Sequence, residues 1–563
     1  MSSGEKILTA AARMALSAAL HGDFRGFGSA IADLENSGTP AHQAWRIALE
    51  SMRWSFEPFA ARPPTIGGVG RLIGAPLELR EAGVRTCVIA ERVAIATLDG
   101  DRLGEWIHLH AELIDPNDAT AEDSDDPALG LDSARLWYRL LTGTGPVGPS
   151  DEEAKSLQDK AARRGAGAQV IEAAVARAIM ALSHGAIEDA VDLARQALRM
   201  AQAEAQPSCE YLAGLTLARV RRYSGRPHLA LHILSALRRA APPFWAGWIG
   251  WEILLAGGEP ADSVGDFLSP SANARDALAR VLDTARDGDE AAFAIASSAL
   301  RGSSAIWPDM ARETDALLST LDPGGQVTEA TAHWIRGDTA TIPCGLHGIG
   351  IPRCVGAEIE GATAFVIASP STPGRRFLRP GLALAASARL LTRDSAKSSA
   401  AGVRTETGVA ALALAGRAGI SRQEFFRRVY GFPFVAQRHQ AVLDVLCHRA
   451  RQLVGTSGDV RRYSSEEDAD GSTRPALALD LREAIVVPDM RCALPAADRV
   501  LRALATLGAT SASAASDALR MPLRTVQSVL QKLVTEGACS TERDGRHIVY
   551  RIEDTTFTQV TPL

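Results

Sequence analysis

The sequence has few aromatic residues, no excess of basic charge and no regular cysteine pattern. Aromatic side chains make up 5% of the chain, whereas alanine and leucine abound, and these two residues favour helices. The net charge is −6, from 60 basic and 66 acidic residues, so any contact with nucleic acid must be confined to one part of the surface. The seven cysteines are scattered and odd in number, which argues against a secreted disulfide framework and favours a cytoplasmic location.

Long apolar runs and the common catalytic motifs are also missing. The most membrane-like stretch, Phe244 to Gly258, is too short to span a bilayer and contains Glu252. Residues 1–24 contain an apolar-rich run, but Arg13 interrupts it and no convincing signal-peptide cleavage site follows, so we expect an amphipathic helix. No G-x-x-x-x-G-K, H-E-x-x-H or G-x-S-x-G pattern occurs. We therefore expect a protein that is not an enzyme, needs no cofactor and does not enter a membrane.

The 563 residues exceed what one hydrophobic core holds, and the composition changes along the chain. The expected fold class is mainly α: an α-solenoid of helix pairs followed by two small α+β domains. We predict helix pairs at 1–115, an acidic linker with short helices at 116–160, helical repeats at 161–325, a Gly- and Pro-rich β-leaning segment at 326–400, and the small domains at 401–492 and 493–563.

Helix pairs are clearest between residues 169 and 241. Gly185 and Gly225 break two apolar helical patterns at equivalent places, and Pro227 is suited to the first turn of a helix. A helix, a tight turn and an Ala-rich helix, repeated, is typical of a solenoid, and this part resembles tetratricopeptide repeats. Similar patterns around Gly22 and at 272–302 would complete the array. The repeats would bind a peptide, a protein partner or a small ligand, or would only pack and dimerise the molecule.

The segment after residue 341 is rich in glycine, proline and β-branched residues, and Thr363 to Ala368 is a strand candidate. Cys344, His347 and Cys354 invite comparison with a metal site. They lack the paired spacing of zinc ligands, so turn glycines and half-buried thiols are the preferred interpretation. We expect no metal.

The first small domain begins with three predicted helices. Val409, Leu412 and Leu414 suit the first helix, Gly419 a turn, and Ser421 with Glu424 a capping box at the start of the second. The second helix would turn its apolar side inward through Phe425, Phe426 and Val429. In the third, Val442, Leu446 and Leu453 are expected to pack inward. The opposite stripe is polar and consists of Gln437, Gln440, Asp444, His448 and Arg451.

The residues from about Thr405 to Asp489 resemble the winged-helix effector domain of OmpR/PhoB-type response regulators. The matching elements are Val429 to Gly431, Leu443 to Val445 and Arg449 to Arg451. In that family the third helix enters the major groove, and a β-hairpin wing grips the minor groove. The resemblance implies DNA contacts by Gln437, Arg438, Gln440, His448 and Arg451, with Arg461 and Arg462 at the base of the hairpin. Carboxylates at the hairpin tip would repel phosphate, so a conventional wing contact is not expected; they are Glu466, Glu467, Asp468 and Asp470.

A second small domain has the order helix, helix, helix and hairpin. We predict inner faces formed by Val500, Leu501, Leu504 and Leu507 in the first helix, and by Leu523, Val526, Leu530 and Leu533 in the third, with a second helix at Ala514 to Leu519. Gly537 would end the third helix, and Asp544 with Gly545 would form a tight turn. This part resembles MarR/ArsR-like winged helices. The implied DNA contacts are Arg524, Thr525, Gln527, Ser528, Gln531, Lys532 and Arg546.

Local charge agrees with a DNA contact, because residues 404–459 contain eight arginines against four acids, a local charge of +4 in an acidic chain. A solvated helix surface is the alternative. Our hypothesis is a cytoplasmic, bacterial-type transcription regulator that binds double-stranded DNA as a homodimer. The alternative is a non-enzymatic scaffold or adaptor protein whose repeats and winged helices bind other proteins.

Overall fold

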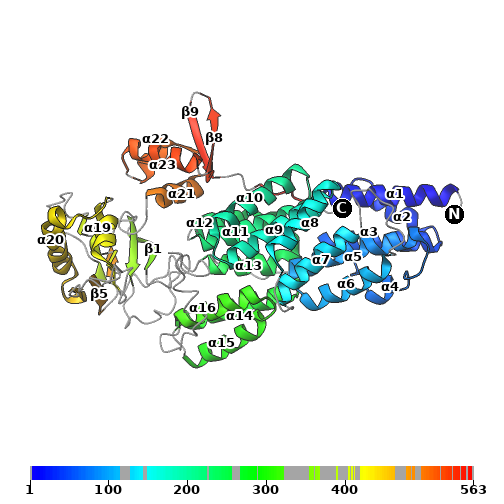
Figure 1. Ribbon diagram of the computed structural model, residues 1–563, viewed down its shortest axis with the longest axis horizontal. Coiled ribbons are helices and arrows are strands. Elements are labelled where there is room, and N and C mark those ends of the chain that lie inside the picture. The colour runs from blue at the N-terminus through cyan, green and yellow to red at the C-terminus, as the bar shows by residue number, and fades with distance from the viewer. Residues whose placement is uncertain are drawn as a thin grey trace.

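The computed structural model is mainly α-helical (Figure 1). Among the described residues, no helix combines the length and apolar character needed to cross a bilayer. The described residues are 3–114, 127–143, 149–224, 227–256, 267–287, 290–321, 354–359, 362–367, 389–390, 404–405, 407–409, 411–412, 419–430, 432–462, 477–482, 485–487, 496–519, 521–535, 537–545, 547–552 and 556–560.

The first part of the chain is a succession of helices that pack mostly against their neighbours in sequence. They are α1 (Ser3–Leu20), α2 (Phe27–Glu35), α3 (Pro40–Phe56), α4 (Ile66–Gly70), α5 (Leu77–Thr97), α6 (Gly100–Leu113), α7 (Pro127–Thr142), α8 (Asp151–Arg163), α9 (Gly167–Ser183), α10 (Ile187–Ala203), α11 (Pro207–Tyr223), α12 (Pro227–Ala240), η2 (Pro243–Trp245), α13 (Ala246–Leu255), α14 (Pro270–Asp287), α15 (Glu290–Ser304) and α16 (Pro308–Leu321). We call this part, α1 to α16, the helical half.

The predicted helix breaks are confirmed where the structure describes them. Gly185 has φ +79° and separates α9 from α10, and Gly22 has φ +79° in the turn between α1 and α2. Both turns need the left-handed backbone conformation that glycine adopts without strain. Pro227 begins α12 as predicted, while Gly225 lies outside the described residues.

One hydrophobic core runs through the helical half from Ala12 to Leu318. Helices α7 and α8 belong to it, because Trp137 of α7 and Ala154 and Ala161 of α8 are fully buried in this core. The acidic run expected within 116–160 lies mostly at 115–126, outside the described residues.

A network of fully buried charges joins α11 to α13 and α16. Arg219 Nη1 and Arg222 Nε each lie 2.7 Å from the carboxylate of Glu252. Both arginines also contact Glu313 of α16, which accepts hydrogen bonds from the Tyr223 hydroxyl at 2.8 Å and from the Trp251 indole at 2.8 Å. Because buried charges are costly unless paired, these contacts fix how the three helices fit together.

Strands within residues 354–390 and at residues 485–487 together form a small sheet of order β1-β2-β6-β3. Its strands are β1 (Cys354–Ile359), β2 (Ala362–Ile367), β3 (Arg389–Leu390) and β6 (Ile485–Val487). Strand β2 confirms the predicted strand. Cys344 and His347 lie outside the described residues, and within the described part no group of three side chains is placed to hold a metal.

The first small domain contains α19 (Arg422–Tyr430), α20 (Ala436–Val454), β4 (Gly458–Arg462) and β5 (Leu477–Leu481). The described residues between 404 and 412 are helical, and Ile420 forms a bridge with Leu477 beside the antiparallel pair β4–β5. Ser421 Oγ accepts the Glu424 amide at 3.2 Å, as expected of the cap, and Phe425 and Phe426 are buried as predicted. Leu414 lies outside the described residues.

The prediction for Val442 was wrong, since this side chain is 41% exposed. The inner face of α20 consists instead of Leu443, Leu446, Cys447, Ala450 and Val454. These residues follow the helical repeat, and Val442 lies about 100° from Leu443 around the axis.

The second small domain contains α21 (Ala496–Leu507), β7 (Thr510–Ser511), α22 (Ala512–Leu519), α23 (Leu523–Thr535), β8 (Cys539–Asp544) and β9 (His547–Ile552), with strand order β7-β9-β8. Leu507 and Leu523 were wrongly predicted to be internal: they are 48% and 43% exposed, because each is the terminal residue of its helix. The hairpin turn is shifted by one residue, since Asp544 pairs with His547 and the loop begins at Gly545.

Candidate nucleic-acid interface

The polar stripe of α20 is largely engaged within its own domain. Asp444 accepts hydrogen bonds from Gln440 at 3.0 Å and from Arg462 of β4 at 2.9 Å. Arg451 Nε donates to the carbonyl of Val460 at 3.0 Å, and Arg461 pairs with Asp480 at 2.7 Å. Four of the predicted DNA-binding residues, Gln440, Arg451, Arg461 and Arg462, therefore make contacts within this domain that hold α20, β4 and β5 together.

The remaining predicted residues of α20 face solvent. Gln437, Arg438 and His448 are exposed, and Arg449 is exposed beside them. The predicted acidic hairpin tip at 466–470 lies outside the described residues, so the structure does not place it.

Exposed apolar side chains lie on one flank of α20. Val442 and Val445 are 41% and 50% exposed, and Phe432 and Val435 at the start of the helix are 47% and 43% exposed. Val442 and Val445 are three residues apart and therefore share a helix face with Arg438. This flank is mixed apolar and basic, whereas the opposite flank is polar.

An aromatic cluster positions the start of α20. The ring of Phe426 stacks on Tyr430 at 4.4 Å and on His439 at 4.7 Å, and His439 Nδ1 accepts the Val435 amide at 2.9 Å. Burial raises the pKa of the Tyr430 hydroxyl, and the Arg404 guanidinium lies over its ring at 5.1 Å. These contacts fix the angle between α19 and α20.

Removing the Asp444 carboxylate tests two roles of this residue: its contribution to the stability of the domain and its repulsion of an anionic ligand. We expect Asp444→Ala to lower the free energy of unfolding of this domain by no more than about 1 kcal/mol, because the Arg462 pair is partly exposed. If this face binds duplex DNA, the affinity should rise about two- to fivefold, since one negative charge is lost from the face. Thermal unfolding and fluorescence anisotropy measure the two effects, and weaker DNA binding would contradict the second.

The outer face of α23 is polar and fully presented to solvent. Val526, Leu530 and Leu533 are completely buried, so the opposite side of the helix points outward. All the predicted DNA-binding residues on this helix are exposed; they are Arg524, Thr525, Gln527, Ser528, Gln531 and Lys532. Arg546 lies outside the described residues.

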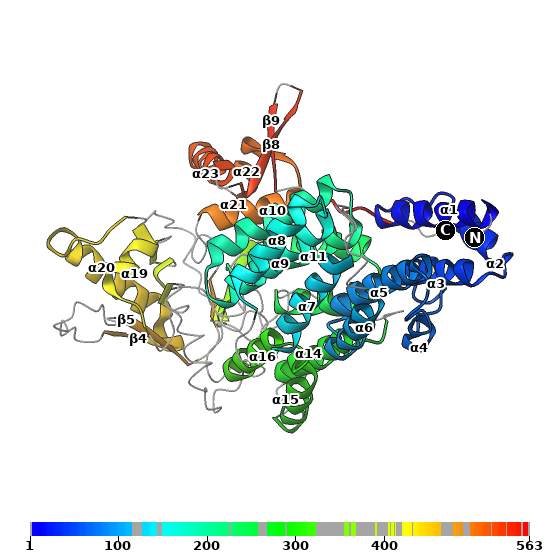
Figure 2. The same cartoon turned by 45° about the vertical axis from the view of Figure 1, so that its right-hand side comes forward.

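The second domain rests on the helical half through α21 and through Gly537, just after the end of α23. Leu229 of α12 is part of the same buried cluster as Leu501 of α21, and Arg195 of α10 donates a hydrogen bond to the carbonyl of Gly537. Helix α21 lies against α12, and Figures 1 and 2 show the β8–β9 hairpin directed away from the helical half. The docking therefore leaves the outer face of α23 accessible.

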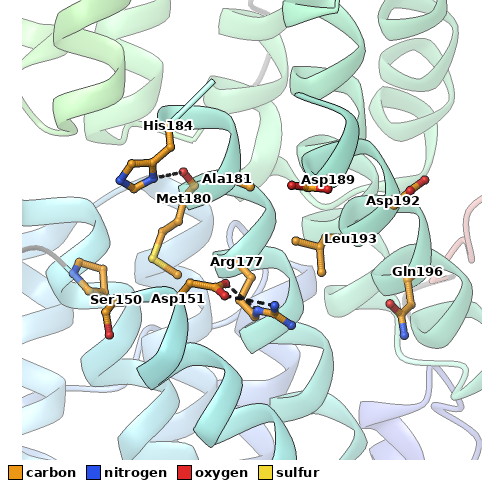
Figure 3. Close-up of a pocket in the computed structure, with 11 residues that line it drawn as sticks. Ser150, Asp151, Arg177, Met180, Ala181, His184, Asp189, Asp192, Leu193 and Gln196 are labelled. Carbon is orange, nitrogen blue, oxygen red and sulfur yellow. Dashed lines mark hydrogen bonds and ion pairs between the residues drawn. The ribbon is translucent and has the colours of Figure 1, made fainter. Parts of the chain in front are cut away.

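The helical half contains a groove of about 720 Å³ between α8, α9 and α10 (Figure 3). Met180 and Leu193 form apolar parts of its wall, and the carboxylates of Asp189 and Asp192 project from α10. Arg177 pairs with Asp151 at 2.7 Å. Sequence patterns alone did not indicate this groove, because its residues come from three separate helices.

Comparison with protein-family models, curated proteins and solved structures gave no match to this chain. The two small domains present exposed helices, α20 and α23, whose side chains suit contact with a polar or anionic surface.

Proposed function

We propose that the chain is a transcription regulator that binds double-stranded DNA through two winged-helix domains. The shared topology supports this proposal. In each domain a helical segment precedes a short extended element, two helices and a β-hairpin, and the short element pairs with the last strand of the hairpin: Ile420 with Leu477, and β7 with β9. This is the order of helix-turn-helix variants that carry a wing.

The outer face of α23 is the observation that carries the proposal. Within the described part of the chain, the exposed side chains of Arg524, Gln527, Ser528 and Gln531 make no side-chain hydrogen bond. Arginine and glutamine form bidentate hydrogen bonds with guanine and adenine edges in the major groove. A helix held by an apolar inner face, with these four exposed polar side chains on its outer face, meets the requirement for base contact.

In this proposal the helical half is a tetratricopeptide-like solenoid that senses a signal. The groove between α8 and α10 is large enough for a small ligand or a peptide side chain. We further propose that the protein acts in the cytoplasm as a homodimer, because two copies would read paired half-sites.

Two arginines of α20 provide a test in the first domain. We expect Arg438→Ala combined with Arg449→Ala to weaken binding of a labelled DNA duplex by about tenfold at low salt, because two phosphate contacts are lost. Fluorescence anisotropy of the full chain measures this effect. Thermal unfolding should be unchanged, since both side chains are exposed. If the variant and the parent chain bind the DNA duplex with equal affinity, α20 does not contact DNA.

A scaffold or adaptor protein is the second candidate function. The exposed apolar flank of α20, with Val442, Val445, Phe432 and Val435, favours a protein contact for the first domain. A protein partner that co-purifies after nuclease treatment and is lost in Val442→Ser with Val445→Ser would support the adaptor. Unchanged DNA affinity in the same variant would place that contact outside the DNA interface.

A further inference from the structure

Residues 556–560 return to the helical half and lie on α11. The side-chain amide of Gln202, at the end of α10, donates to the carbonyl of Thr556 at 3.1 Å. The Tyr211 hydroxyl donates to the carbonyl of Thr558 at 2.6 Å. The Glu210 carboxylate accepts both the amide of Thr558 and its hydroxyl, each at 2.9 Å. The helical half therefore binds both the backbone of this segment and the side chain of Thr558.

The side chain of Phe557 fills a space that only glycine leaves open. Phe557 is 8% exposed and belongs to the core of the helical half. A Cβ atom on Gly214 of α11 would lie 2.4 Å from Cε1 of the Phe557 ring. Glycine in the middle of a helix is unfavourable relative to alanine. The glycine at position 214 of α11 is therefore explained by the space that the Phe557 ring occupies.

The groups that bind the segment are enclosed in the complex. Glu210 is 2% exposed and Tyr211 is completely buried with the segment in place, so both side chains are held against Thr558. Burial raises the pKa of the Tyr211 hydroxyl, which keeps it protonated and able to donate. Hydrogen bonds to an ionised carboxylate are stronger than those between neutral groups.

We propose that α11, with Gln202 of α10, is a peptide-binding site that recognises an aromatic residue followed by threonine, and that residues 556–560 of this chain are its ligand. Only residues 553–555 connect β9 to Thr556. Binding of the segment therefore restrains the second domain near α10 and α12, where Leu229 and Arg195 also hold it. The site stands independently of DNA binding.

Gly214→Ala and Phe557→Ala form a double-mutant cycle that tests this site. In the full chain, amide hydrogen exchange of residues 556–560 should be slowed at Thr558 by about tenfold or more relative to the free peptide. Either substitution should abolish that protection, the first by blocking the space and the second by removing the ring. In the Phe557→Ala chain, Gly214→Ala should raise the melting temperature, because alanine favours the helix and no ring remains to be displaced.

Glu210→Gln provides a second arm that does not depend on Gly214. An amide offers one acceptor oxygen instead of two, so protection at Thr558 should fall about tenfold, whereas Glu188→Gln on the exposed side of α10 should leave it unchanged. Unprotected exchange of Thr558 in the parent chain would overturn the proposal. Full protection in Gly214→Ala, with α11 intact by circular dichroism, would overturn it as well.

Discussion

Replacing Glu313 with leucine is expected to lower the free energy of unfolding of the helical half by about 3–5 kcal/mol. Leucine is close to glutamate in volume, so the loss does not come from a cavity. It comes from the guanidinium groups of Arg219 and Arg222, which are fully buried and would each lose a carboxylate partner. Removing one partner from a buried ion pair leaves an uncompensated charge. Urea unfolding followed by circular dichroism measures the change.

Asp315→Asn on the same helix is the matched control. Asp315 is exposed, and its carboxylate lies 3.7 Å from Arg301, so its loss should cost less than about 1 kcal/mol. If the two variants unfold at the same denaturant concentration, the buried network does not stabilise the packing of α11 against α16.

The pH dependence of stability provides a further test of the buried charge network of Arg219, Arg222 and Glu313. Burial opposes ionisation of Glu313, but Arg219 and Arg222 outweigh it and hold the pKa of this carboxyl below its ordinary value of 4.5. The ionised form is therefore favoured in the folded state. Its contribution to stability is complete above the unfolded-state pKa and is lost as pH falls through the folded-state pKa. Glu313→Leu should lack this acid-dependent part of the stability.

Charge reversal on α23 should have the largest effect on DNA binding. We expect Arg524→Glu combined with Lys532→Glu to weaken binding of duplex DNA by roughly 100-fold or more at low salt. In the proposed complex, two cations that would neutralise phosphate are lost, and two carboxylates are placed against the phosphate backbone. Both residues are exposed and lie opposite the inner face formed by Val526 and Leu530, so the domain should remain folded. Fluorescence anisotropy with the full chain measures the loss.

Lys155→Glu combined with Arg163→Glu on α8 is the control for net charge. These residues are exposed in the helical half, and the substitutions change the total charge by the same amount. Binding should weaken only slightly, because distant charges are screened by salt. An equal loss in the two variants would show that DNA responds to the net charge of the chain and not to the face of α23.

Local patterns predicted the parts of the fold that depend on neighbouring residues. The turn at Gly185, the helix start at Pro227 and the cap at Ser421 each follow from backbone conformation or a contact within a few residues, and the structure confirms them. The errors at Leu507 and Leu523 arose where helices end, because periodicity gives the direction of a face but not the last residue that reaches the core.

Contacts between distant segments could not be predicted in this way. Phe557 and Gly214 meet across more than three hundred residues, and neither residue type indicates a partner. Arg222 and Glu313 are also far apart in the chain, and charged residues on apolar helices are usually read as surface positions. The hydrogen bond from Arg462 to Asp444 depends on the position of β4 beside α20. The spacing of residues along a helix does not determine that position.

The salt dependence of DNA binding by the full chain tests the proposed function most directly. Anisotropy titrations with labelled duplex DNA between about 50 and 200 mM salt should give saturable binding whose affinity falls linearly on a double-logarithmic plot. The slope should be shallower by about 2 when Arg524 and Lys532 are both replaced by alanine, because two phosphate contacts disappear. Absence of binding at the lowest salt, or the same slope in both chains, would contradict a DNA interface on α23.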